Sequence, residues 1–268
     1  MDIVLLMAAA VVSCQMVFLW LLSIPLRNVS IVDIGWGMGF VLVAWLSAPN
    51  TAGSRAILHL LVTVWGVRLT GYLWLRNHGK PEDYRYVAMR EKRPSSFVWS
   101  SLFRVFALQG FIMWLIALPI IVTNSDASAE PNWIPIFCGC LLWLIGMVFE
   151  VVGDWQLARF KSDADNQGKV MDSGLWKYTR HPNYFGEFVI WWGHWLICLG
   201  LTDPTKTWWT IISPALMSFL LLKVSGVALL EQAMKTRSPE YESYIQRTSA
   251  FFPRRPIQNL STDVPSAS

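Results

Sequence analysis

Residues 133–156 read WIPIFCGCLLWLIGMVFEVVGDWQ, and no charged side chain occurs before Glu150. An apolar run of about 20 residues is the length that an α-helix needs to cross the hydrocarbon core of a bilayer. The run ends in Glu150 and Asp154, which are four residues apart and therefore lie on one face of the expected helix. The stretch predicts a membrane helix with two carboxyl groups near one end.

The rest of the chain has the same apolar character. Of its 268 residues, 54% are hydrophobic, 15% are charged and 16 are tryptophan, a balance outside the usual range of soluble domains. We therefore expect an all-α integral membrane protein, a bundle of seven transmembrane helices. The expected spans are residues 3–24, 31–48, 56–75, 97–122, 133–156, 184–201 and 207–234, of which the second and sixth are the shortest.

Lysine and arginine in the connections give the expected orientation, because cytoplasmic loops retain positive charge. Arg27, residues 76–104, residues 159–180 and the tail at 235–255 fall on one side, and only Arg55 and Lys206 mark the other. The N-terminus is expected outside and the C-terminus in the cytoplasm, in a bacterial inner membrane or the endoplasmic reticulum. The net charge of +4 then reflects topology and contact with membrane lipids, and no nucleic-acid partner is expected.

No internal repeat or separate soluble domain is visible in the chain. Residues 1–256 are expected to form a single domain, and the small polar residues 257–268 a disordered tail. The first apolar run begins with Asp2 instead of a basic segment, so a permanent helix is expected rather than a secretory signal.

Polar side chains recur near the inner ends of five expected helices. Arg68, Tyr72 and Arg76 are spaced four apart, as are Asn183 and Glu187, so each set lies on one helix face. Charges buried in the inner half of a bilayer need partners or a hydrated cavity, and the pattern predicts a pocket open to the cytoplasm. The alternative is a set of interhelical salt bridges that only hold the bundle together. The remaining polar residues at this depth are Asp33, Glu150, Asp154, Lys223 and Glu231.

Two expected cytoplasmic loops, residues 76–86 and 159–181, combine cations, aromatic rings and carboxylates. This mixture suits a multiply phosphorylated nucleotide. The glycine-spaced run GWGMG at 35–39 lies inside a span with no strand before it, so it predicts close helix packing rather than a phosphate loop. His181 and His194 have no partner at the spacing of a tetrahedral site, and no metal is expected.

The densest polar stretch is GLWKYTRHPNYFGE at 174–187, which runs directly into the sixth expected span. Ionisable groups are costly to keep beside lipid, so the stretch predicts a functional site at the membrane surface. An ordinary basic cytoplasmic loop is the alternative.

At these residues the chain resembles the steroid 5-alpha-reductase family, in particular its bacterial branch, over nearly its whole length. The motifs that carry the resemblance are VDIGWG at 32–37, WGVRL at 65–69 with Tyr72 and Arg76, EDYRY at 82–86, GDW at 153–155 and the 174–187 stretch. The RHPNY core of that stretch and the C-terminal SPEYESY at 238–244 also resemble membrane methyltransferases that act on isoprenylcysteine or phospholipid.

The resemblance implies a seven-helix bundle that holds NADPH in a cytoplasm-facing cavity, with a lipophilic enone such as a 3-oxo-delta4 steroid entering from the bilayer. Asp154, Asn183 and Glu187 match the cofactor-binding Asp, Asn and Glu of the family, and Tyr72 matches a tyrosine on its third helix. Together with the polar loops, the expected cofactor-binding residues are Arg68, Arg76, Asp83, Tyr84, Arg85, Asp154, Lys161, Tyr178, Arg180, His181, Asn183, Tyr184 and Glu187.

Reduction of an enone needs a hydrogen-bond donor at the carbonyl oxygen, where negative charge develops. The mammalian steroid enzymes use a Glu on the second helix and a Tyr on the third, and the nearest equivalents in this chain are Asp33 and Trp65. We expect Asp33 to be the acid and Tyr72 its helper, with Glu150 as the alternative acid. The expected substrate-binding residues are Trp36, Trp65 and Glu150.

Two other functions compete with the reductase. An S-adenosylmethionine-dependent lipid methyltransferase shares the cytoplasmic cavity, but Asp33 and the run at 82–86 weigh against it. In a non-enzymatic lipid-binding or scaffold protein, the charges would only stabilise helix contacts.

Overall fold

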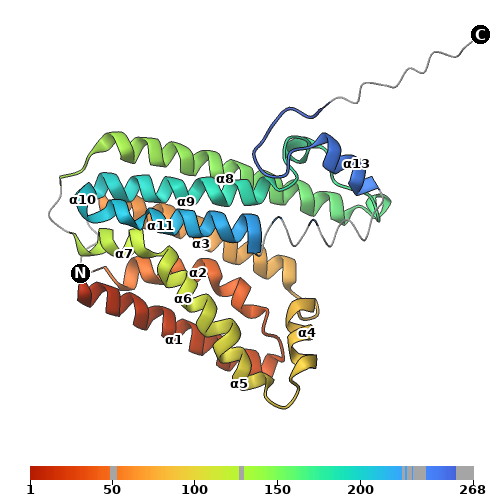
Figure 1. Ribbon diagram of the computed structural model, residues 1–268, viewed down its shortest axis with the longest axis horizontal. Helices are drawn as coiled ribbons and strands as arrows, with labels where there is room; N and C mark the ends of the chain where they lie inside the picture. The colour runs from red at the N-terminus through yellow and green to blue at the C-terminus, as the bar shows by residue number, and fades with distance from the viewer. Residues whose placement is uncertain (49–52, 127–129, 225–226, 228–230, 232–239, 258–268) are drawn as a thin grey trace, which may run out of the picture. The chain divides into compact units, whose positions relative to one another are not determined.

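The computed structural model describes residues 1–48, 53–126, 130–224, 227, 231 and 240–257 (Figure 1). Every regular element in these residues is a helix, so the expected all-α class is confirmed. Two compact units are distinguished, unit 1 with residues 1–141 and 192–215, and unit 2 with residues 142–191 and 216–268. The single domain expected over residues 1–256 stays a prediction.

Five helical segments of the described residues are long and apolar enough to cross a membrane. They coincide with the first, third, fourth, fifth and seventh expected spans. Residues 225–226, 228–230 and 232–234 of the seventh span, and residues 258–268 of the expected tail, lie outside the described residues. The five segments are α1 (Asp2–Leu26), α3 (Arg55–Asn77), Phe97–Ile116, α8 (Trp133–Ser162) and Pro204–Val224.

The second and sixth expected spans form helices that do not meet the same criteria. They are α2 (Ile31–Leu46), with 16 residues, and α9 (Pro182–Leu201), with 20 residues. At a rise of about 1.5 Å per residue, α2 is about 24 Å long, which is shorter than the hydrocarbon core. The seven-helix count is therefore not established by helix length and composition alone.

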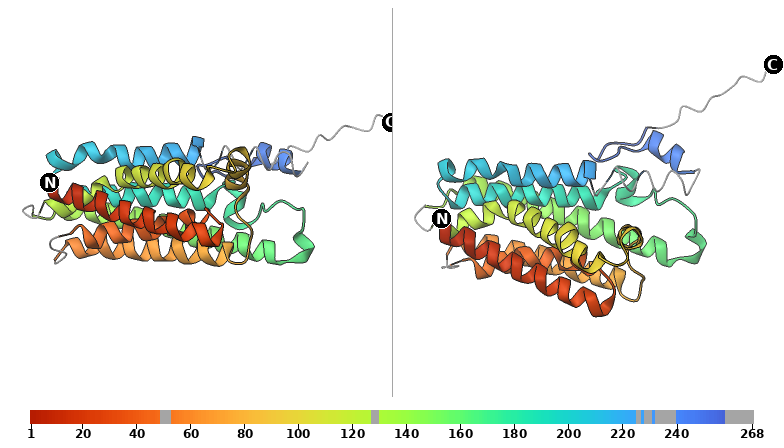
Figure 2. Two further views of the ribbon diagram at one scale, coloured as in Figure 1. Left: turned by 90° about the horizontal axis from the view of Figure 1, so that it is seen from below. Right: turned by 60° about the horizontal axis from the view of Figure 1, so that its bottom comes forward.

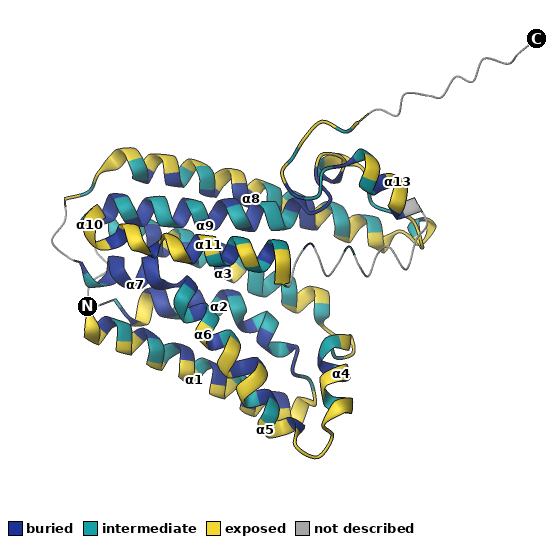
Figure 3. Cartoon of the chain, in the orientation of Figure 1, coloured by how far each residue is buried: buried dark blue, intermediate teal, exposed yellow. Residues whose placement is uncertain are grey.

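One face of α1 is buried along its whole length. Its buried residues Val4, Ala8, Val12, Met16 and Trp20 are each four apart, which is the spacing of a single helix face. Leu6 and Phe18 on the other faces are 70% and 62% exposed, and Figure 3 shows exposed residues along the outer side of α1. An apolar outer surface of this size is costly in water and is the expected surface of a helix that contacts lipid.

The glycines of α2 allow the helix to pack closely against α1 and α3, which run beside it (Figure 2). A Cβ on Gly37 would lie 2.5 Å from the Gly66 carbonyl oxygen of α3, and one on Gly35 would lie 2.5 Å from Leu19 of α1. At Gly37 a methyl group would collide with backbone, whereas at Gly35 it would displace the end of the Leu19 side chain. The interpretation of residues 35–39 as a helix-packing face is confirmed.

The fourth expected span, residues 97–122, is interrupted in the structure. It consists of α5 (Phe97–Ser101), the π-helix η1 (Leu102–Ala107) and α6 (Leu108–Ile116), and a separate helix α7 (Leu118–Ser125) follows. Pro119 lies in the first turn of α7, where its missing N–H costs little. The sequence-based boundary at 122 was therefore wrong, because the proline that starts a new helix was included in the span.

Glycines on α8 and α9 bring these helices into close contact. In unit 2, a Cβ on Gly146 would lie 2.6 Å from the Gly186 carbonyl oxygen, and in unit 1 a Cβ on Gly139 would lie 2.6 Å from that of Gly193. Both helices carry their glycines seven residues apart, which keeps them on one face of the helix. Small residues of this kind let membrane helices pack backbone to backbone.

The C-terminal part of unit 2 is bound to residues 173–181. The helix α13 (Glu240–Arg247) places the Tyr244 hydroxyl 2.5 Å from the Trp176 carbonyl oxygen. Beyond it, Thr179 donates to the Phe251 carbonyl at 2.7 Å, and the Arg254 N–H donates to the Tyr178 carbonyl at 3.0 Å. These bonds hold the polar loop before α9 in a fixed conformation.

Candidate functional site

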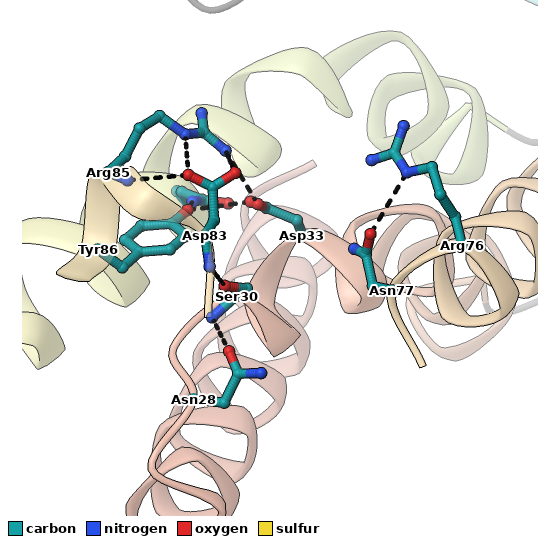
Figure 4. Close-up of polar contacts among 9 residues, drawn as sticks. Asn28, Ser30, Asp33, Arg76, Asn77, Asp83, Arg85 and Tyr86 are labelled. Atoms are coloured by element: carbon teal, nitrogen blue, oxygen red, sulfur yellow. Dashed lines mark hydrogen bonds and ion pairs between the residues drawn. The ribbon is translucent and has the colours of Figure 1, made fainter. Parts of the chain in front are cut away.

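The first turn of α2 places Asp33 beside the segment 82–86 in unit 1 (Figure 4). One oxygen of the Asp33 carboxylate accepts a hydrogen bond from the Tyr86 hydroxyl at 3.1 Å, and the other accepts one from Arg85 at 3.3 Å. Arg85 also binds both oxygens of Asp83, at 2.9 and 3.2 Å. The structure thus brings together Asp33, Asp83 and Arg85, all of which the sequence indicates as site residues.

Local chain geometry explains why the segment 82–86 lies at this position. Asp83 is the N-cap of α4 (Tyr84–Lys92), and its side chain accepts from the Arg85 N–H at 2.9 Å. The Asp83 N–H donates to the Ser30 hydroxyl at 2.8 Å. Glu82 accepts from the Val29 N–H at 2.7 Å and pairs with Arg90 at 2.9 Å. The connection between α1 and α2 is therefore bound directly to the start of α4.

The charges in this cluster reinforce one another. Burial by itself would raise the pKa of Asp83, but the hydrogen bonds from Arg85 outweigh it and hold that pKa below its ordinary value. Burial would lower the pKa of Arg85, and the two carboxylates raise it instead. Burial, and next the charge of Asp33, raise the pKa of the Tyr86 hydroxyl, so that this hydroxyl is a hydrogen donor at neutral pH.

Tyr86 and Gln109 are two members of this site that the sequence-based list of site residues omits. The Tyr86 side chain is buried, and its hydroxyl accepts a hydrogen bond from the Gln109 amide at 3.2 Å while it donates to Asp33. Gln109 lies within α6, an otherwise apolar helix. A lone amide in an apolar span is the sequence signal that could have identified it.

Arg68, Tyr72 and Arg76 lie on one face of α3, as their spacing predicts. The guanidinium carbons of Arg68 and Arg76 lie 5.4 and 5.6 Å from the centre of the Tyr72 ring, within the range of a cation–π contact. Arg76 also donates to Asn77 at 3.4 Å.

In unit 1, a cleft of about 740 Å³ opens beside Asp33 and Arg85. Its polar end includes Asp33, Asp83 and Arg85, and its walls come from α1, α2 and α3. Trp36 and Trp65, both expected to contact the substrate, are not among the described residues that line it. Trp65 is fully buried, with its ring 5.6 Å from that of Phe40, so its observed contacts are those of a core residue.

In unit 2, a second polar cluster lies where α8 meets the start of α9. Asn183 donates to the Asp154 carboxylate at 3.2 Å, and Glu187 accepts from the Trp191 indole at 2.9 Å. The Cγ of Glu150 would lie 2.8 Å from a Cβ on Gly186. Glu150, Asp154 and Glu187 are all buried, and the structure brings Asn183 together with Asp154.

Arg180 and His181 lie in the loop before α9 and face Glu231. Arg180 is buried, pairs with Glu231 at 2.6 Å, and donates to the carbonyls of Ile245, at 3.1 Å, and Thr248. The His181 Nε2 lies 3.5 Å from Glu231. These contacts make Arg180 an anchor of the C-terminal segment, and its predicted contact with the cofactor stays a prediction.

The other expected cofactor residues lie at the surfaces of their units. Tyr84, Lys161 and Tyr178 are exposed, and the Tyr184 ring stacks on His181 at 5.7 Å. Lys161 and Tyr178 belong to unit 2, as do the buried carboxyl groups of Glu150, Asp154 and Glu187. Cations suit phosphates, and carboxylates accept hydrogen bonds from ribose hydroxyls. Within the described residues, no group of three or more His, Cys, Asp or Glu could hold a metal ion.

The chain belongs to the family described as "Protein of unknown function (DUF1295)", whose model matches residues 15–248. An uncharacterized protein of Schizosaccharomyces pombe is 26% identical over 268 residues, which cover 88% of this chain and 76% of that protein. No solved structure matches the chain.

Steroid reductases are also similar to parts of the chain. The 3-oxo-5-alpha-steroid 4-dehydrogenase 1 of Mus musculus is 35% identical over 110 residues, 40% of this chain and 41% of that protein. The steroid 5-alpha-reductase DET2 of Gossypium hirsutum is 34% identical over 66 residues, 25% of this chain and 26% of that protein. Both matches span less than half of the reductase. The resemblance to steroid 5-alpha-reductases that the motifs predict is confirmed.

Proposed function

We propose, from the partial matches to steroid reductases, that the chain is a membrane reductase that uses NADPH to reduce the C=C bond of a lipophilic enone, such as a 3-oxo-delta4 steroid. The observation that carries the proposal is that Asp33 and Arg85 lie at the polar end of a cleft, where the buried Tyr86 donates a hydrogen bond to Asp33. A carbonyl compound that enters such a cleft meets proton-bearing groups at its polar end. The partial matches to 3-oxo-5-alpha-steroid 4-dehydrogenases support the reaction class.

The residues of unit 2 suit the cofactor. Asp154, Asn183 and Glu187 supply acceptors and an amide for ribose and nicotinamide groups, and Lys161 with the loop before α9 supplies positive charge for phosphates. NADPH, when bound, supplies the hydride that is added to the β-carbon of the enone. The protein's own groups hold the cofactor and substrate and exclude water.

Asp33 is the proposed acid at the substrate carbonyl. Its two hydrogen bonds, from Tyr86 and Arg85, fix the carboxyl group in one orientation, and its side chain is 30% exposed beside the cleft that it lines. A positioned donor stabilises the enolate charge that develops on the carbonyl oxygen. The Tyr86 hydroxyl donates to Asp33 and orients it, so Tyr86 replaces Tyr72 as the proposed helper. The α-carbon of the enolate takes a proton from water, which completes the addition of hydride and proton across the C=C bond.

The proposed topology has seven spans, with α2 and α9 included, the N-terminus outside and the C-terminus in the cytoplasm. The excess of lysine and arginine in the connections at 76–104 and 159–180 supports it. In this orientation Asp33 and residues 82–86 face the cytoplasm, where NADPH is available.

The test is thermal stabilisation of the detergent-purified protein by NADPH, NADH and S-adenosylmethionine, followed by NADPH oxidation with a 3-oxo-delta4 steroid. A ligand that binds the native state raises the melting temperature by mass action. A shift with NADPH and turnover of the enone are expected. A shift with S-adenosylmethionine alone would replace the proposal by methyl transfer, and no shift with any ligand would favour a scaffold.

A further inference from the structure

Unit 1 has a second hollow, an apolar groove that shares no lining residue with the cleft at Asp33. The groove follows α1 on one side and η1 with α6 on the other, and these helices run beside each other (Figure 1). Its volume is about 400 Å³, and no charged side chain is among the described residues that line it. The groove therefore suits a hydrocarbon chain rather than a polar ligand.

Small residues create the groove. A Cβ on Gly110 would lie 2.9 Å from the Met16 side chain, so Gly110 lets the two helices approach closely at its floor. Ser13 and Ala107 line the groove and are exposed, so no large side chain fills it at these positions. Along α1 the groove follows residues 9–17, which correspond to about 12 Å of helix.

Positive charge lies near one end of the groove. Arg104 precedes the groove residues Ala107 and Phe111 by three and seven positions, and all three residues are exposed, so they share one outward face of the helix. Lys92 and Arg93 are exposed as well and lie shortly before α5. Among the residues that the structure describes, no partner in an ion pair is found for these three cations. An anion at this end of the groove would meet positive charge that no carboxylate neutralises.

Trp99 indicates the depth of the membrane surface beside these cations. It is 64% exposed, and its ring lies 5.3 Å from that of Trp20, whose indole donates to the Val98 carbonyl at 3.0 Å. Tryptophan is enriched at the level of the lipid head groups. Arg104 comes five residues later, and side chains of a helix tilt toward its N-terminus, so the guanidinium reaches back toward the head groups.

We propose that this groove binds one anionic glycerophospholipid, with its phosphate at Arg104 and one acyl chain between α1 and α6. A guanidinium binds phosphate through two parallel hydrogen bonds, and Lys92 and Arg93 add attraction for a head group of net negative charge. A helix from a second copy of the chain is a poorer occupant, because a two-fold contact would bring the cations of both copies together. This lipid site does not depend on the proposed reductase activity.

The test is native mass spectrometry of the purified, delipidated full-length protein in detergent. Phosphatidylglycerol and phosphatidylcholine with the same acyl chains are added separately, so that only the head group differs. Arg104→Gln removes the proposed phosphate ligand, and its matched control Arg255→Gln removes an exposed cation of unit 2. Ala107→Phe fills the groove, and its matched control Ala10→Phe changes an exposed alanine of α1 that does not line the groove.

The wild type is expected to bind phosphatidylglycerol about tenfold more tightly than phosphatidylcholine, and Arg104→Gln to reduce this preference to about twofold. Ala107→Phe is expected to weaken both lipids about tenfold, because both place an acyl chain in the groove. Each control variant is expected to change either affinity by less than about twofold. Ser13→Phe fills the groove from α1 and takes the place of Ala107→Phe if that variant does not fold.

Equal binding of the two lipids by the wild type would overturn the proposal. Equal losses of phosphatidylglycerol in Arg104→Gln and Arg255→Gln would also overturn it, since they would show a general attraction between a positively charged protein and an anionic lipid. Equal effects of Ala107→Phe and Ala10→Phe would exclude the groove as the site of the acyl chain. A dimer in the same spectra that Ala107→Phe converts to a monomer would assign the groove to a second copy instead.

Discussion

At the scale of single residues, Asp33 is the group on which the proposed chemistry depends. Asp33→Asn removes the acid but keeps the size of the side chain, so turnover of the enone is expected to fall by about 10²- to 10⁴-fold. The NADPH-induced rise in melting temperature should persist, because the proposed cofactor residues are unchanged. Tyr72→Phe is the control and should keep most activity. Full turnover by Asp33→Asn would move the acid to another residue, with Glu150 tested next.

The raised pKa of Tyr86 predicts how the stability of the protein changes at alkaline pH. Burial and the charge of Asp33 raise its pKa in the folded state, so its contribution to stability is complete below the unfolded value of about 10 and is lost as the pH rises through the folded pKa. Between these two values the free energy of unfolding falls by up to about 1.4 kcal/mol per pH unit. Between pH 9 and 11 the melting temperature should therefore fall less steeply with pH for Tyr86→Phe than for the wild type. Parallel declines would contradict the raised pKa.

Arg180 has two interpretations that a single substitution separates. Arg180→Ala removes the closer partner of Glu231, which keeps only His181, and the donor to two backbone carbonyls, and a loss of about 3–5 kcal/mol in unfolding free energy is expected. Lys161→Ala is the control, since Lys161 is exposed, and it should leave stability nearly unchanged. Unchanged melting together with weaker NADPH binding would instead make Arg180 a phosphate ligand.

At the scale of elements, the glycines of α8 and α9 make a stability prediction. A Cβ on Gly186 would lie 2.5 Å from the Gly146 carbonyl oxygen, so Gly186→Ala must separate the two helices and is expected to lower stability by about 1–3 kcal/mol. Gly71→Ala in α3 meets nothing within 4 Å and is expected to raise stability by about 0.5–1 kcal/mol. The stability of both variants is measured by thermal melting in one detergent. Equal effects would show that the α8–α9 contact does not require glycine.

The positions of the helices were predictable from the sequence because apolar runs determine them. The residues at which helices end, and the side chains that meet between helices, were less predictable. Residues 133–156 and 56–75 correspond to α8 and α3, whereas the fourth span ends early because Pro119 begins α7. For the candidate site, likewise, residue types were predictable from the sequence and contacts between distant residues were not. Asp33 and Arg85 could be named from their residue types, but Gln109 could not be paired with Tyr86, since residues 23 positions apart in sequence meet only through helix packing.

At the scale of the whole molecule, the distribution of positive charge predicts which connections face the cytoplasm. Lys80 lies in the connection between α3 and α4, and Thr205 lies in α10 (Pro204–Thr207) near Lys206 and Asp203. Both residues are exposed. With the N-terminus outside, Lys80 faces the cytoplasm and Thr205 faces the opposite side.

Cysteine labelling tests this topology in cells. Lys80→Cys and Thr205→Cys are made in a chain whose four native cysteines are replaced by alanine, and intact cells receive a membrane-impermeant maleimide. Thr205→Cys should be labelled at once, and Lys80→Cys only after the membrane is permeabilised, because positively charged connections stay on the cytoplasmic side. The reverse order would invert the bundle and place Asp33 away from cytoplasmic NADPH. Labelling of both in intact cells would mean that the chain between them crosses the membrane an even number of times, so that α9 or another expected span does not cross.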